Sequence, residues 1–246
     1  MMTRSNEATH ARTVPVQPVV HTIKISDLQE VLVKGRDDFM AKPSHLLLLA
    51  FIYPIVGFFL ATFSFGYDML PLLFPLVSGF ALIGPLAAVG LYEMSRGREQ
   101  GLDIGWMHAF EVFKTPAIFS IFLLGILQML IYFAWLGTAL IIYRITLGAF
   151  IPTSITGFFD QVFTTGAGWL LIIAGCGAGA MFAGIVLAVS AVSFPMLVDQ
   201  DVGPVVAVQT SLRAVSANPV TMAIWGVIVA ITLVIGSLPF FVASLS

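Results

Sequence analysis

The feature that most constrains this chain is the stretch 167–198, which is predominantly apolar and contains no Asp, Glu, Lys or Arg. A membrane-spanning helix needs about 20 consecutive apolar residues, so this stretch is long enough to cross a bilayer. The whole chain is 59% hydrophobic and only 10% charged, whereas a soluble domain carries about 25% charged residues. The sequence therefore predicts an all-α, polytopic membrane helical bundle.

Four further apolar runs accompany this stretch. Together they predict a membrane domain over 44–246 with about five spans, at 44–65, 70–92, 117–143, 168–198 and 220–245. The polar residues that precede the first run make a cleavable signal peptide unexpected.

The N-terminal part divides into two segments. Residues 1–25 predict a disordered cytoplasmic tail, because they are polar or β-branched, contain prolines and show no helical period. Residues 26–43 predict an amphipathic helix on the inner membrane surface. Ser26 with Gln29 resembles a capping box that would begin this helix.

The distribution of basic residues predicts the orientation of the spans. Of the 11 Lys and Arg residues, all except Arg144 fall on the side shared by the N-terminus, the 93–116 segment and the 199–218 segment. Basic residues are retained on the cytoplasmic side of a membrane. We therefore expect the N-terminus to lie in the cytoplasm.

Three prolines mark a recurring unit. Pro43, Pro116 and Pro219 stand at the first turn of an expected span, where the missing N–H costs no helical hydrogen bond. An amphipathic segment precedes each proline, and two spans joined by an outer turn follow it, which predicts a parallel repeat. The third copy has only its first span. Two interpretations stay open: five spans with an external C-terminus, or a sixth span that relatives possess beyond Ser246.

Charged residues gather after the second span and again after the fourth. Ionisable groups at the end of a span either serve a function or anchor the topology through interfacial ion pairs. The repeat would bring the two groups together, so we treat them as one candidate cytoplasmic cluster for partner docking or gating: Glu93, Arg96, Arg98, Glu99, Asp199, Asp201 and Arg213.

Small residues fill the first half of the span at 168–198. Gly175 and Gly179 stand in GxxxG spacing, and Gly184 follows them. Because small residues let two membrane helices approach closely, we expect these glycines to pack against another helix.

The span at 117–143 carries polar side chains at Gln128, Tyr132 and Thr138. Hydrogen bonds between helices are one interpretation, and the lining of a solute path is the other. No span carries a charge near its middle, so ion-coupled transport is weakly supported.

Two stretches, together with MAIW at 222–225, resemble a bacterial membrane protein family known as domain of unknown function 2189: GPLAAVGLYEMSRGREQG (84–101) and FPMLVDQDVGPVVAVQTSLRAVSANP (194–219). The resemblance covers roughly residues 30–245 and implies a bacterial cytoplasmic (inner) membrane protein. The family has no settled activity, although some members carry a label that links them to cytochrome c oxidase. Its members usually continue past the position of Ser246 into another apolar stretch and a cytoplasmic end with His and Trp.

An oxidase role for this chain can be examined on its residues. A haem–copper catalytic subunit needs several histidines inside its spans. None of the four stands in the interior of an expected span, and His45 is at a span boundary: His10, His21, His45 and His108. The single cysteine, Cys176, excludes an internal disulfide and a multi-cysteine metal site. We predict no catalytic residue, cofactor or metal, and no nucleic-acid partner because no Lys/Arg-rich run is present.

The leading hypothesis is a non-catalytic accessory, assembly or scaffold component that packs against the lipid bilayer and against other membrane proteins. A respiratory complex as the partner is implied by the family label alone. A transporter or channel for a small solute or a lipid is the alternative, motivated by proline-broken spans in repeated units.

Overall fold

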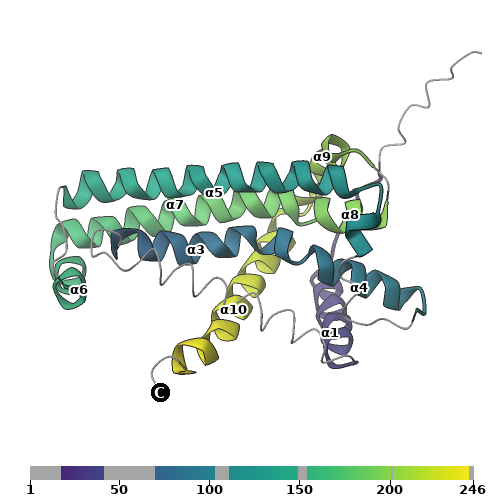
Figure 1. Cartoon of the computed structure of the whole chain (residues 1–246), viewed down its shortest axis with the longest axis horizontal. Coiled ribbons are helices and arrows are strands. Elements are labelled where there is room, and N and C mark those ends of the chain that lie inside the picture. Colours follow the sequence, from purple (N-terminus) through teal and green to yellow (C-terminus); the bar gives the residue numbers. More distant parts are fainter. Residues whose placement is uncertain (1–17, 42–69, 103–110, 149–153, 201, 244–246) are drawn as a thin grey trace, which may run out of the picture.

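The computed structural model describes residues 18–41, 70–102, 111–148, 154–200 and 202–243. Every regular element in those ranges is helical. The long axis of the molecule follows α5 (Ile118–Leu147) and α7 (Gly166–Ser190), which run side by side (Figure 1). The expected all-α membrane helical bundle is confirmed.

Within the described ranges, two helices are long and apolar enough to cross a membrane. One is α5, which matches the expected span 117–143, and the other runs over Gly166–Asp199 and matches 168–198. The second comprises α7 and α8 (Ser193–Asp199), with a short turn between them. A third passes only as one span bent by 105°, made of α9 (Pro204–Ala217) and the part of α10 (Pro219–Ala243) up to Leu233.

The other expected spans are placed less directly. The stretch 44–65 lies outside the described residues. The stretch 70–92 corresponds to α3 (Leu70–Ala87) and the beginning of α4 (Val89–Glu99), which meet at Ala88. Pro85 weakens the helix just before this junction, because it has no backbone N–H to donate to the carbonyl one turn earlier. The count of five spans stays a prediction.

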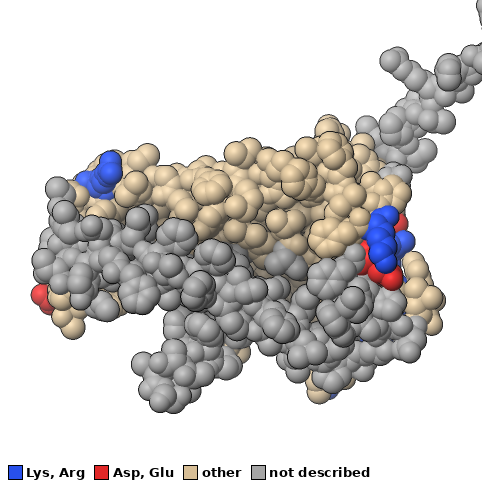
Figure 2. All heavy atoms as spheres, viewed as in Figure 1, with Lys and Arg blue, Asp and Glu red and all other residues tan. Residues whose placement is uncertain are grey.

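In the described part of the chain, two groups of buried side chains hold the helices together. The first fills the space between α5, α8 and α9 and includes Leu124, Phe194 and Leu197. The second joins α3, α5 and α7 through Leu82, Trp135 and Phe182. Many other large apolar side chains are exposed on the outside of the helices. In the view of Figure 2, the described Lys, Arg, Asp and Glu residues lie towards the ends of the molecule.

The N-terminal helix α1 (Ile25–Ala41) begins one residue earlier than expected and ends at 41 rather than 43. The capping box that we predicted differs as well. The carboxylate of Asp27, rather than Gln29, accepts the backbone N–H before the helix, from Lys24 at 2.9 Å. One turn on, Glu30 lies 2.8 Å from the Lys34 ammonium, and the hydrogen bond to Glu30 raises the pKa of Lys34.

The three span-start prolines have different outcomes. Pro219 is the first residue of α10, as predicted. Pro116 precedes α5, which begins at Ile118. Pro43 lies outside the described residues, as do residues 103–110 of the second amphipathic segment, whose end forms a 3₁₀ turn over 111–114. The repeat therefore stays a prediction.

Candidate functional site

Three charged side chains from α4 and α8 meet at one end of the bundle, where Figure 2 shows basic and acidic atoms together. Arg96 follows Glu93 by one helical turn, and its Nη1 lies 3.2 Å from Glu93 Oε2 and 3.4 Å from Oε1. Its Nε lies 3.8 Å from Asp199 Oδ1 at the end of α8. One guanidinium therefore joins two carboxylates that are more than a hundred positions apart, and we call these three residues the ion triad.

The members of the ion triad differ in their contact with solvent. The Glu93 side chain is 12% exposed, that of Arg96 31% and that of Asp199 64%. Arg96 Nε is buried and has no hydrogen-bond partner among the described residues, since 3.8 Å to Asp199 is too long for one. Loss of the Arg96 side chain would leave a nearly buried Glu93 carboxylate without its partner, which is costlier than breaking an exposed pair.

The remaining residues of the predicted cluster lie elsewhere. Arg98 and Glu99 are exposed at the C-terminal end of α4, and Asp201 is outside the described residues. Arg213 lies on α9, where its Nε donates to the Gln209 carbonyl at 3.3 Å. It lines a shallow groove of about 730 Å³ with residues 18–20, Leu212, Ser216 and Ala217. The predicted meeting of the two charged stretches is therefore seen for Arg96 and Asp199.

A segment that we predicted to be disordered is held against the bend between α9 and α10. Residues 18–24, which we call the N-terminal strap, form no helix. The Ile23 N–H donates to Asn218 Oδ1 at 2.7 Å, and Asn218 Nδ2 donates to the His21 carbonyl at 3.1 Å. The Thr221 hydroxyl donates to the Ile23 carbonyl at 3.0 Å. Residues 1–17 of the expected tail lie outside the described residues.

Asn218 holds both sides of this bend. Its side chain is only 4% exposed, and besides the strap it binds the Ala214 carbonyl at 3.0 Å. Its backbone N–H completes the last turn of α9. The Asn-Pro pair at 218–219 reads in the sequence as a helix boundary, and nothing in the local pattern indicates a contact with residues 21–23. This tertiary role of Asn218 was missed.

A second bend separates α7 from α8, and hydroxyl groups satisfy its backbone. The Val192 N–H lies in the turn and donates to Ser211 Oγ of α9 at 3.2 Å. Ser190 and Ser193 are buried, and their hydroxyls donate to carbonyls one turn earlier in the chain. Because no water is present in an apolar bilayer to satisfy a broken helix, such contacts are what permit the bend.

The polar residues predicted in α5 mainly serve contacts between helices or within one. Gln128 is buried, and its Nε2 donates to the Leu82 carbonyl of α3. Tyr132 and Trp135 close over Gly79 of α3, and Trp135 Nε1 donates to the Pro75 carbonyl at 3.0 Å. Thr138 donates to the Ala134 carbonyl of its own helix. Gln128 Oε1 has no hydrogen-bond partner in the described part of the chain.

The three candidate packing glycines are not equivalent. A Cβ added at Gly179 would meet the Trp135 ring of α5 at 3.4 Å. One added at Gly175 or Gly184 would meet no described atom within 4 Å. Gly184 lies on an exposed face of α7 with Ala180 and Ala183. Part of the small-residue surface therefore packs inside the bundle, and part faces outward.

The described residues contain no group of three or more His, Cys, Asp and Glu side chains able to hold a metal ion. Of the four histidines, His21 is described and exposed, and the others lie outside the described ranges. In the ion triad both carboxylates already face a cation. What this arrangement can do is join α4 to α8 through a partly buried charge contact.

The apolar helices define an integral membrane protein, and in Figure 2 the described charged residues lie towards the ends of the molecule. The chain belongs to the family described as predicted integral membrane protein (DUF2189), whose model matches residues 73–199, more than half of the 246 residues. This confirms the resemblance over a shorter region than 30–245. Neither the curated proteins nor the solved structures contain a match to the chain.

Proposed function

We propose that this protein is a non-catalytic accessory, assembly or scaffold component that packs against other proteins in a bacterial inner membrane, with its N-terminus in the cytoplasm. The observation that supports this proposal is the outward face of α7. There Ala180, Ala183 and Gly184 are exposed, and only 6% of the most apolar stretch of this span is buried. A face of small residues allows another helix to approach closely. We propose a respiratory complex as that partner only because some members of the family that the sequence resembles carry a label linking them to cytochrome c oxidase.

The test uses a bulky substitution on this face. Gly184→Leu adds a side chain where no described atom lies within 4 Å, so the protein should fold while a close-packed partner is displaced. Ala134→Leu, on the exposed face of α5, is the matched control. Tagged full-length variants are purified in a mild detergent, partners are identified by mass spectrometry, and haem is read by absorbance.

We expect wild type and Ala134→Leu to retain a stoichiometric membrane partner and Gly184→Leu to lose it. Co-purified respiratory subunits with their haem would support the respiratory assignment. Equal recovery of the partner by Gly184→Leu would show that this face is not the contact. A wild-type protein that purifies alone and without haem would contradict the accessory role.

A transporter or channel for a small solute or a lipid is the second candidate. It is favoured by the bends at residues 191–192 and at Asn218. The Ser211 hydroxyl stabilises the first bend, and the Asn218 side chain ties the second bend to the backbone of Ile23. Glu93→Gln and Arg98→Ala separate the two functions. A transporter should lose flux in vesicles while it stays assembled, and a docking protein should lose its partner. If flux, assembly and abundance all stay unchanged, the charged residues anchor the topology only.

A further inference from the structure

The short helix α6 (Ile155–Thr164) is strongly amphipathic and lies at the end of the bundle opposite α4 and α8 (Figure 1). Its apolar residues share one side, where Val162 is buried against the bundle and Phe159 and Phe163 are 52% and 55% exposed. Asp160 and Thr164 are exposed on the other side. The helix therefore exposes an aromatic edge between its buried side and its polar side.

Several contacts fix α6 rigidly to α7. The Thr165 hydroxyl donates to the Gln161 carbonyl at 2.6 Å and accepts the Gly168 N–H at 3.0 Å. Gly168 lies so close to α6 that a Cβ there would overlap the Val162 carbonyl oxygen. Trp169 Nε1 donates to the Phe163 carbonyl at 3.1 Å. The direction of α6 is thus set by the direction of α7.

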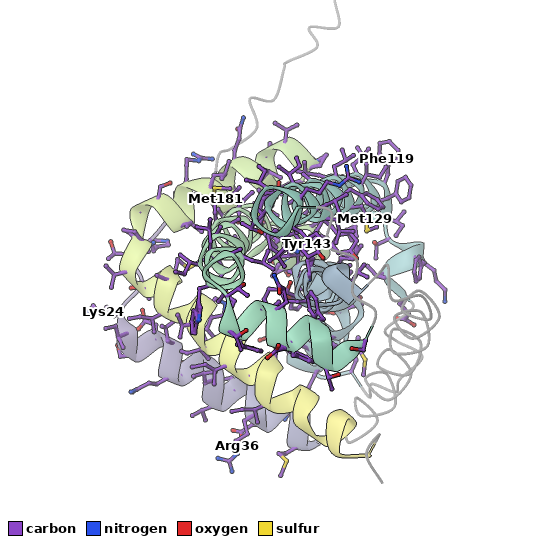
Figure 3. The ribbon with its side chains drawn as sticks, turned by 90° about the vertical axis from the view of Figure 1, so that its left-hand side faces the viewer. Lys24, Arg36, Phe119, Met129, Tyr143 and Met181 are labelled. Atoms are coloured by element: carbon purple, nitrogen blue, oxygen red, sulfur yellow. The ribbon has the colours of Figure 1, made fainter. Side chains whose placement is uncertain are left out.

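That direction is across the bundle rather than along it. In Figure 3 α5 and α7 are seen nearly down their axes, while α6 crosses the view in front of them. If α5 and α7 cross the membrane, α6 lies close to the membrane plane. Trp169 of α7 and Arg144 of α5 both lie three residues from the helix end near α6, about 4.5 Å at 1.5 Å per residue. Both side chains are exposed at a similar level.

The aromatic edge continues onto the surface of the span. Phe159 stacks on Phe163 with ring centroids 6.0 Å apart. Trp169 follows, 53% exposed, and one turn further along α7 Ile173 is 67% exposed. Trp and Phe at a water–membrane boundary place an apolar ring among the acyl chains, and the Trp N–H is satisfied at the polar level.

We propose that α6 is an interfacial anchor that inserts Phe159, Phe163 and Trp169 into the boundary between lipid headgroups and acyl chains at this end of the bundle. The ligand is the bilayer surface itself. An amphipathic helix of this kind is buried about 5–10 Å into the boundary, and its rigid link to α7 sets the depth of the α5–α7 pair. This inference rests on the spans and is independent of the accessory role.

Nitroxide labels on the full-length protein in phosphatidylcholine–phosphatidylglycerol nanodiscs test the proposal. The exposed Cys176 is first replaced by Ser so that each label is unique. Labels are placed at Phe159→Cys and Phe163→Cys on the aromatic edge, and at Asp160→Cys and Thr164→Cys on the polar side. Leu130→Cys, exposed near the middle of α5, gives the reference for the membrane interior.

Collision rates with oxygen and with a water-soluble nickel chelate are compared at each site. We expect the aromatic-edge labels to give oxygen-to-nickel ratios between that of Leu130→Cys and those of Asp160→Cys and Thr164→Cys. Equal nickel access at all four α6 sites would overturn the proposal, because α6 would then lie in water. Protection of the aromatic edge from both reagents would overturn it too, in favour of a protein contact.

A second measurement guards against labels that disturb α6. Brominated lipids quench Trp fluorescence, and the part due to Trp169 is the difference between wild type and Trp169→Phe. We expect strongest quenching of this part when the bromine is on acyl carbons near the headgroup. No quenching at any depth would contradict the proposal.

Discussion

Replacement of Asn218 by Ala should release the N-terminal strap from the bend between α9 and α10. The side chain makes two hydrogen bonds to the strap, to the Ile23 N–H and the His21 carbonyl. At about 0.5–1.5 kcal/mol for each, the strap would lose about 1–3 kcal/mol of local stability. Since about 1.4 kcal/mol corresponds to a factor of ten, amide exchange in residues 18–24 should accelerate about 5- to 150-fold.

Hydrogen exchange followed by mass spectrometry on the full-length protein in nanodiscs measures this directly. Thr221→Val removes one hydrogen bond to the strap, so its effect should be smaller, about 2- to 13-fold for 0.5–1.5 kcal/mol. Thr232→Val is the control, because that exposed hydroxyl bonds only to the Ile228 carbonyl of its own helix among the contacts seen.

Two outcomes would refute the reasoning behind this prediction. Unchanged exchange over 18–24 in Asn218→Ala would mean that these hydrogen bonds do not hold the strap. Faster exchange throughout α5 as well would mean that the variant unfolds globally, and the bend rather than the strap would then be the element that Asn218 stabilises.

Further predictions concern the α6–α7 corner, the α7–α8 bend and the ion triad, each followed by thermal unfolding in detergent. Gly168→Ala should destabilise the protein by about 1–3 kcal/mol, because the added Cβ would overlap the α6 backbone. Gly177→Ala, with nothing described within 4 Å of the added Cβ, should stabilise the protein by about 0.5–1 kcal/mol. The reverse order of stabilities would contradict close contact between α6 and α7 at Gly168. Ser211→Ala should lower the free energy of unfolding by about 1–3 kcal/mol, because it leaves the Val192 N–H without an acceptor. No loss of stability would mean that this N–H finds another acceptor. Arg96→Ala should lower the free energy of unfolding by about 1–3 kcal/mol, and adding Glu93→Gln should restore part of this loss. If the losses of the two single variants simply add in the double variant, the ion pair does not contribute.

Much of the fold follows from hydrophobic runs alone. The bounds of α5 and of the span over Gly166–Asp199 lie within a few residues of the predicted 117–143 and 168–198. Pro219 was placed correctly at the start of α10. Such features are local, since the length of an apolar run and the missing N–H of a proline act on the helix that contains them.

The candidate site was predictable only in part. Charge at the ends of spans indicated Glu93, Arg96 and Asp199, and the structure brings these three together. Arg213, which the sequence groups with them, lines the groove beside the strap instead. The difference arises because the face of the helix on which a charged residue stands determines which other element it contacts. The neighbouring residues in the sequence do not indicate which element that will be.

The sequence by itself determined that this is a helical membrane protein, because apolar surface and the need to satisfy backbone hydrogen bonds leave few other solutions in a bilayer. Only the tertiary structure decided which polar side chains satisfy the bends. Asn218 meets Ile23, and Ser211 meets Val192. These contacts join residues far apart in the chain, and a hydrogen bond depends on distance and direction that exist only after the helices have packed.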